Sequence, residues 1–171
     1  MKKKILLIKN LQKIINKEKR RGKKIVLCHG VFDLLHIGHI KHFKEAKSLG
    51  DILIVSLTPD IYVNKGPKRP AFKEKLRSEA IAALDVVNYV VINNTPTAIN
   101  MIQKVRPNIY CKGPDYKNHQ NDISGKIKDE VKAIKNIGGK IFYTEDITFS
   151  SSKLLNEYVD IRSKMQKIII K

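Results

Sequence analysis

Two histidines, His36 and His39, stand three residues apart in a turn that leads from an apolar segment into a helix. At this spacing both imidazoles can face the same point beside the first helical turn. Gly38 lies between them and lets a ligand approach the backbone closely. Free backbone N–H groups at that point attract anions, and two imidazoles can stabilise charge that develops on a phosphate. The pair therefore predicts a site that handles phosphate groups.

Two other interpretations of the histidine pair stay open: surface histidines without a function, or half of a zinc site. Zinc needs two further ligands, and the spacing of His42, His119, Cys28 and Cys111 does not obviously supply them. Two cysteines are also too few for a disulfide framework. Each ends an apolar run, where cysteine usually behaves as a small buried apolar residue. We therefore expect no metal held by side chains, and a reducing cytoplasm as the location.

A second candidate for phosphate binding is a run of three serines, Ser150, Ser151 and Ser152, at the expected start of the last helix. Serine hydroxyls at a helix N-terminus cap the backbone and, together with free N–H groups, can hold phosphate oxygens. An ordinary cap needs only one serine, so the run favours a phosphate site.

Basic residues follow the second apolar segment of the chain. The loop of residues 58–71 is rich in Pro, Gly and Lys and contains Lys65. A basic loop beside a phosphate site supplies positive charge, and a solvated loop is the alternative. Arg77 lies in the helix that follows, where a salt bridge to Glu74 or Glu79 is the competing explanation.

The elements that must position these residues alternate along the chain. Apolar segments predict strands at residues 24–28, 51–57, 87–92, 108–112 and 140–144. Helical patterns predict helices at residues 37–49, 72–84, 95–105, 124–137 and 150–166. Alternating strands and helices are typical of an α/β, Rossmann-like fold with a doubly wound, parallel five-stranded sheet. Ligands of such sheets bind beyond the carboxyl ends of the strands, where the turn with the histidines lies.

The charge of the chain is strongly positive, with 34 Lys and Arg against 16 Asp and Glu and a net charge of +18. A surplus of this size indicates an anionic partner. The basic residues are 28 Lys and only 6 Arg, whereas readers of DNA bases favour arginine. We therefore expect no nucleic acid as partner, and we keep a basic nucleic-acid-binding module as the alternative from another class.

Over half of the positive surplus lies in residues 1–24, which contain 11 Lys or Arg and one acid, Glu18. Apolar residues at positions 5, 8, 11, 14 and 15 recur at helical spacing and predict an amphipathic helix that ends near Gly22. We expect residues 1–23 to form an N-terminal arm, as an extra helix whose apolar stripe packs on the domain or whose basic face lies on a membrane. No segment has the length of a membrane span.

Two motifs together resemble a known family. The sequence from Gly30 to His39 and the segment from Phe149 to Lys153 resemble the cytidylyltransferase-like nucleotidyltransferase family. The likeness covers residues 24–158 and is strongest to branches that act on glycerol phosphate or heptose phosphate. The resemblance implies that CMP is transferred from CTP to a phosphorylated substrate with release of pyrophosphate. It also implies Mg²⁺, held mostly by phosphates and water, and a homodimer.

The resemblance assigns roles to individual residues. It makes His36, His39 and Lys65 catalytic. It assigns nucleotide binding to a larger set, which consists of Gly30, Val31, Phe32, Asp33, Gly38, Arg77, Gly113, Asp115, Ser150, Ser151 and Ser152. Gly113 is expected to permit a tight turn beside the base, and Asp115 to be either a binding residue or a turn residue.

One departure from the glycerol phosphate branch bears on the acceptor. Those enzymes carry an arginine shortly before the last serine-rich segment, whereas residues 144–148 here hold acids and no arginine. The heptose phosphate branch also lacks it. We therefore expect a phosphorylated sugar or polyol as acceptor and a CDP-linked precursor of surface polysaccharide as product. The alternative is adenylyl transfer from ATP to a heptose-type phosphate.

The resemblance also bears on the domains of the protein. It is close to a group in which a domain of this kind is joined to a ribokinase-type sugar kinase. We therefore expect residues 24–158 to form the nucleotidyltransferase domain. Residues 159–171 would end the last helix and lead to a further domain, and a kinase would act in the same chain or pathway.

Overall fold

Five apolar segments form one parallel sheet in the computed structural model, which describes residues 4–66, 68–118 and 125–145. The strands are β1 (Ile25–Gly30), β2 (Ile52–Leu57), β3 (Tyr89–Ile92), β4 (Ile109–Lys112) and β5 (Lys140–Tyr143). Almost all residues of β1, β2 and β4 are buried, because helices cover both faces of a parallel sheet. All five predicted strands are therefore confirmed, within two residues at each end.

The order of the strands is β3-β2-β1-β4-β5, and every pair is parallel. The chain builds outwards from β1 through β2 to β3 and then returns to place β4 on the other side of β1. The turns after β1 and β4 consequently lead away in opposite directions and leave a switch point between them, where ligands of such sheets bind. The predicted Rossmann-like, doubly wound fold is confirmed.

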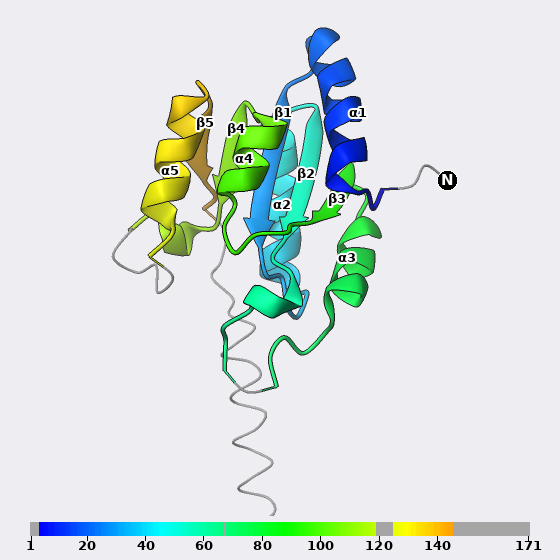
Figure 1. The fold of residues 1–171 in the computed structure, drawn as a ribbon, viewed down its shortest axis with the longest axis vertical. Helices are drawn as coiled ribbons and strands as arrows, with labels where there is room; N and C mark the ends of the chain where they lie inside the picture. Colours follow the sequence, from blue (N-terminus) through cyan, green and yellow to red (C-terminus); the bar gives the residue numbers. More distant parts are fainter. Residues whose placement is uncertain (1–3, 67, 119–124, 146–171) are drawn as a thin grey trace, which may run out of the picture.

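Helices lie on both sides of the sheet (Figure 1). They are α1 (Ile8–Arg20), α2 (Ile37–Ser48), α3 (Glu74–Ala82), α4 (Ile99–Val105) and α5 (Ile127–Asn136), with two short 3-10 helices, η1 (Asp60–Tyr62) and η2 (Pro114–Tyr116). Apolar side chains of α1, α4 and α5 share one core with one face of the sheet. Those of α2 and α3 share a second core with the opposite face. No helix in the described ranges is both long enough and apolar enough to cross a membrane.

Alternation along the central strands divides their side chains between the two cores. Ile25 and Leu27 of β1 pack with α1, α4 and α5, whereas Val26 and Cys28 pack on the side of α2 and α3. In β4, Tyr110 belongs to the first core and its neighbours to the second. This period of two decides which groups at the strand ends reach each side of the switch point.

The predicted N-terminal helix is confirmed as an integral part of the fold. Leu11 and Ile15 of α1 are 0% and 1% exposed within the first core. Just before the helix, Leu6 N donates to Val90 O at 2.9 Å and Val90 N donates to Lys4 O at 2.9 Å, so this segment extends the edge of the sheet beside β3. The apolar stripe of the arm therefore packs on the domain.

One helix begins later than its pattern predicts. Residues 95–105 were expected to form it, with Pro96 in the first turn, but α4 starts at Ile99. The side-chain amide of Asn93 donates to Thr95 O at 2.9 Å and to Thr97 O at 2.7 Å. These bonds hold the preceding residues in a turn that competes with the helix. The helix predicted for residues 150–166 lies outside the described residues.

Replacing Leu11 with Ala tests whether the N-terminal helix stabilises the domain. The substitution should lower the free energy of unfolding by about 2–5 kcal/mol, because it leaves a cavity in a fully buried position. Leu7→Ala is the matched control: Leu7 is 74% exposed, so a change within about 0.5 kcal/mol is expected. Urea denaturation followed by circular dichroism measures both. Equal effects of the two substitutions would contradict the packing of α1.

Candidate active site

The turn from β1 into α2 brings the two predicted histidines together. The rings of His36 and His39 are stacked, with centroids 3.8 Å apart and planes 21° apart. His36 is the residue before α2, and Gly38 is buried in its first turn. The edge of the Phe32 ring packs against His39 at 5.2 Å between centroids. The arrangement matches the one expected from the sequence.

Phe32 has an uncommon backbone conformation that brings its ring to this place. Its φ is +47°, a region that costs energy for residues with a side chain and is often found at functional sites. A Cβ atom on Gly30 would lie 3.1 Å from Phe32 Cζ. Glycine at position 30 therefore leaves the room that the ring needs to support His39.

Asp33 holds the basic loop against this turn. Its side chain is buried and accepts hydrogen bonds from Arg69 Nε and from the backbone N–H of Ala71, each at 2.6 Å. The contact with Arg69 is an ion pair in which both side chains are buried. Asp33 thus anchors the segment that follows Lys65, and its predicted contact with a nucleotide stays a prediction.

Arg77 of α3 is 2% exposed and joins the same loops. Its guanidinium donates to Thr58 O at 2.9 Å, to Phe72 O at 3.0 Å, to Val31 O and to Asp60 Oδ1 at 2.7 Å. Its ionic partner is therefore Asp60, and not Glu74 or Glu79 as the competing explanation supposed. With these bonds made, Arg77 fixes the positions of the loops; direct contact with a nucleotide stays a prediction.

A cavity of about 180 Å³ lies at the carboxyl ends of β1 and β4. Gly30 and Val31 line it, as do three lysines from three different segments: Lys65, Lys112 and Lys126. Three ammonium groups around one small cavity favour an anionic ligand. The cavity lies at the switch point of the sheet, as the fold predicts.

A buried carboxylate, that of Glu130, lines the cavity. Glu130 of α5 accepts hydrogen bonds from Ala98 N at 3.0 Å and Tyr110 Oη at 2.8 Å, and it pairs with Lys112 Nζ at 3.6 Å. Burial alone would raise the pKa of Glu130, but Lys112, His29 and these hydrogen bonds outweigh it, so the pKa is lowered. Glu130 therefore stays ionised and holds Lys112 in place.

His29, the second-to-last residue of β1, also lines the cavity. Its Nδ1 lies 3.1 Å from Ser56 Oγ, and its Nε2 lies 3.3 Å from Thr58 Oγ1. Burial lowers the pKa of His29 to about 4. The imidazole is therefore neutral at pH 7 and serves as a fixed hydrogen-bonding group.

The histidine pair and Lys65 affect one another electrostatically. Burial, followed by the charges of His36, His42 and Lys65, lowers the pKa of His39 to about 3. Burial and Lys65 also lower the pKa of His36. His39 Nδ1 is buried and has no hydrogen-bond partner among the described residues. A phosphate group at this point would supply the missing partner and favour the charged forms.

Lys65 lies between the two parts of the site. It lines the cavity, and its charge lowers the pKa values of both histidines of the pair. The side chain is exposed as a whole, yet the protein around its ammonium group, with Arg69, lowers the pKa of Lys65. A group bound to Lys65 would therefore lie at the cavity and close to the histidine pair.

The remaining predicted residues differ in how far the structure places them. Gly113 precedes η2 with a φ of −68°, so the expected tight turn does not require glycine there. A Cβ atom on it would meet nothing within 4 Å, which leaves space for a ligand. Asp115 is exposed in η2. Ser150, Ser151 and Ser152 lie outside the described residues.

The carboxylates near the site bear on the expected Mg²⁺. Asp33, Asp60 and Glu130 each already accept hydrogen bonds or pair with a cation. The described residues thus offer a magnesium ion few free carboxylate oxygens. The arrangement fits an ion held by phosphates and water, with the lysines placed to balance the remaining negative charge.

Sequence reasoning did not select His29, Thr58, Lys112, Lys126 and Glu130 as site residues. A signal existed for two of them, because His29 and Lys112 stand at the carboxyl ends of adjacent parallel strands. Lys126 and Glu130 reach the cavity from the start of α5. Their place depends on how α5 packs against α4, which their spacing in sequence does not show.

The buried histidines predict a loss of stability in mild acid. Burial lowers the pKa values of His29, His39 and His42 to about 4, 3 and 4, against 6.5 for free histidine. Between pH 6.5 and about 4 the unfolded chain therefore binds more protons than the folded one, and the free energy of unfolding should fall as pH falls. Urea denaturation at about pH 7.5, 6 and 5 tests this above the range where carboxylates titrate. A constant free energy over that range would contradict the pKa values.

Comparisons with known proteins agree with this geometry. The family model described as cytidylyltransferase-like matches residues 27–163. A relative from Geobacter metallireducens named bifunctional protein HldE is 38% identical over 159 residues, 92% of this chain and 30% of its own length. A protein of the same name from Aliarcobacter butzleri is 39% identical over 139 residues, 80% of this chain and 29% of its own length. The chain thus spans less than a third of these relatives.

Solved structures show the same fold. The lipopolysaccharide core biosynthesis protein from Thermoplasma volcanium superposes with a TM-score of 0.61 at 29% identity and covers 74% of this chain and 100% of its own. Pantoate-beta-alanine ligase from Francisella tularensis gives a TM-score of 0.65 at 21% identity, over 98% of this chain and 79% of its own, and shows the fold alone. From the family model, the identities and the stacked histidines at the switch point, the chain belongs to the cytidylyltransferase-like family of nucleotidyltransferases.

Proposed function

We propose that this chain transfers the AMP group of ATP to a phosphorylated sugar and releases pyrophosphate. The proposal rests on the position of Lys65. This side chain lines the cavity, and its charge lowers the pKa values of both stacked histidines. An acceptor phosphate in the cavity and the α-phosphate of a nucleotide beside the histidines would then meet at one ammonium group.

The reaction needs no covalent enzyme intermediate. A phosphate oxygen of the acceptor attacks the α-phosphorus of the nucleotide in line. A new P–O bond forms while the bond from the α-phosphorus to the bridging oxygen of pyrophosphate breaks, and pyrophosphate leaves with that electron pair. The protein contributes orientation and stabilisation of charge.

The side chains divide this work. His39 and His36 are neutral before the substrate binds and present ring nitrogens to the α-phosphate. Lys65 bridges the acceptor phosphate and the α-phosphate, and Lys112 and Lys126, which also line the cavity, hold the acceptor. Mg²⁺, bound through the phosphates and water, would neutralise charge on the triphosphate.

A sugar phosphate suits the cavity in size and chemistry. The cavity has a volume of about 180 Å³. This is below the roughly 300–1,000 Å³ typical of sites for drug-sized ligands, so the cavity suits a small acceptor. The lysines complement a phosphate, while Tyr116 beside them offers a polar group to sugar hydroxyls. The Thermoplasma protein is named for lipopolysaccharide core biosynthesis, and this likeness supports a sugar acceptor.

The comparisons favour ATP over the CTP that the motifs led us to expect. The relatives are bifunctional by name, and this chain matches less than a third of each. That arrangement fits the heptose phosphate type of enzyme joined to a sugar kinase, for which the resemblance implied ATP. A kinase activity in the same chain or pathway would supply the sugar phosphate, and the homodimer stays a prediction.

Pyrophosphate release with four nucleoside triphosphates and a panel of sugar and polyol phosphates tests the proposal. We expect release with ATP and a sugar phosphate to exceed that with CTP by at least about tenfold, a ratio that contacts to a base readily supply. Preference for CTP would instead support a CDP-linked product. No release from any pair by a folded sample would overturn nucleotidyl transfer.

Replacing His39 with Ala tests the role of the histidine pair. The variant should lower kcat by roughly two to four orders of magnitude, because it removes a preorganised donor from the reacting phosphate. Lys41→Ala is the matched control, since Lys41 is exposed on the same helix; its kcat should stay within about twofold. Near-normal turnover of the His39 variant would contradict the assignment.

A further inference from the structure

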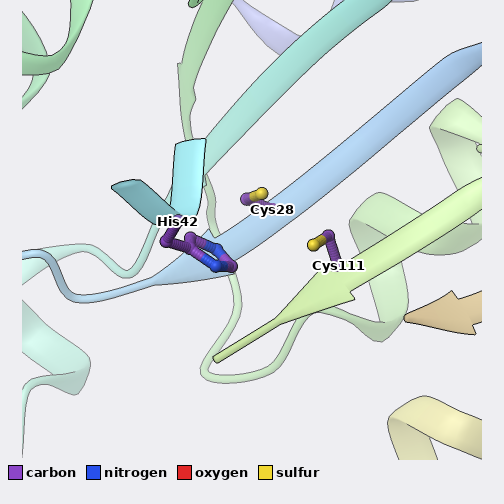
Figure 2. Close-up of side chains that lie close together, drawn as sticks. All are labelled: Cys28, His42 and Cys111. Atoms are coloured by element: carbon purple, nitrogen blue, oxygen red, sulfur yellow. The ribbon is translucent and has the colours of Figure 1, made fainter. Parts of the chain in front are cut away.

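Two cysteines and a histidine meet in the core on the side of the sheet away from the cavity. Cys28 of β1 and Cys111 of β4 are register partners on adjacent strands, and His42 of α2 lies over them (Figure 2). The two sulfurs and a ring nitrogen of His42 all lie within 4.8 Å of one another. Both cysteines are 0% exposed and His42 is 8% exposed.

Hydrogen bonds determine which nitrogen of His42 carries a lone pair. The Thr144 hydroxyl donates to Lys112 O at 3.4 Å, so its oxygen is left to accept from His42 Nδ1, 3.0 Å away. This arrangement places the ring proton on Nδ1 and the lone pair on Nε2. Histidines that bind metals commonly have their second nitrogen fixed in this way.

We propose that Cys28, Cys111 and His42 form a three-coordinate site for a monovalent thiophilic metal ion of the copper(I) class. Thiolate ligands select such soft ions, and imidazole is a suitable third ligand. On binding, both thiol protons leave to solvent and the two sulfurs coordinate as thiolates. The metal undergoes no change of oxidation state.

The geometry requires only small movements of side chains. Metal–sulfur bonds of about 2.3 Å would place two sulfurs roughly 4 Å apart in a trigonal site. The present separations of up to 4.8 Å therefore need to shorten by less than about 1 Å. Rotation of cysteine side chains can supply that without moving the strands.

The number of ligands separates a monovalent ion from zinc. Structural zinc is almost always bound by four ligands, and in the described part of the chain only these three potential ligands gather here. The buried position also leaves little access for water as a fourth. Two thiolates with one monovalent cation carry a net charge of −1, and the positive charge of the nearby Lys112 acts on both Cys28 and His42.

Without a metal, Cys28 keeps its proton and His42 is uncharged. Burial and a hydrogen bond with Cys111 raise the pKa of the Cys28 thiol, and burial lowers the pKa of His42 to about 4. The Cys28 thiol is therefore neutral at pH 7 and the imidazole keeps its lone pair. Binding should accordingly release protons and be weaker in acid.

Titration of the reduced, metal-free full chain with copper(I) under anaerobic conditions tests the site. We expect one equivalent to bind in competition with a colorimetric copper(I) chelator, and an ultraviolet thiolate-to-metal absorption band to appear. Zinc(II), titrated in parallel, should bind at least tenfold more weakly. Failure to bind copper(I), or tighter binding of zinc(II), would overturn the proposal.

The double variant Cys28→Ala/Cys111→Val is the matched control, because it retains the histidine pair of the active site, His36 and His39. It should lose the absorption band and the tight equivalent, and unchanged binding would assign the metal to other residues. If the double variant does not fold, Thr144→Val serves instead. It removes the partner of His42 Nδ1 and should weaken binding about 10–100-fold, and unchanged affinity would contradict the site.

Discussion

The active site depends on two carboxylates, one buried and one partly exposed, that hold a group of like charges together. Arg69 and Arg77 lie close enough to Lys65 for their charges to lower its pKa, and cations this close repel one another. Asp33 pairs with Arg69, and Asp60 pairs with Arg77. Each carboxylate thereby neutralises one guanidinium and fixes a loop, which leaves Lys65 as the charge available for a ligand. Burial makes such pairs costly to break, so the loops are held in place before a substrate arrives.

The topology of the sheet explains why these groups converge. β1 is central, and its neighbours β2 and β4 lead to Thr58 and Lys112 at the same end of the sheet. The segment before α1 lies beside β3 at the far edge, so the N-terminal helix completes the core without approaching the cavity. Much of the positive charge of the chain, concentrated in residues 1–24, is thus separate from the charge that acts in the site.

The sequence predicted the strands and the histidine pair because both are local. Alternation and a spacing of three residues need no knowledge of distant contacts. The partner of Arg77 was not predicted, because Asp60 reaches it through a loop whose path is decided by tertiary packing. Glu130 and Lys126 were missed for the same reason. The late start of α4 depends on hydrogen bonds from the Asn93 side chain, which compete with the first turn of the helix. Helix propensity alone does not take such bonds into account.

Alternation along β1 and β4 also links the proposed metal site to the active site. Cys28 and Cys111 point towards α2, whereas the next residues, His29 and Lys112, line the cavity on the other side. His42 lies one helical turn after His39. A metal that joined the three ligands would therefore tie β1, β4 and α2 together. These are the elements that carry Lys112 and the histidine pair, so a metal in the core cluster would affect how rigidly the groups of the candidate active site are held.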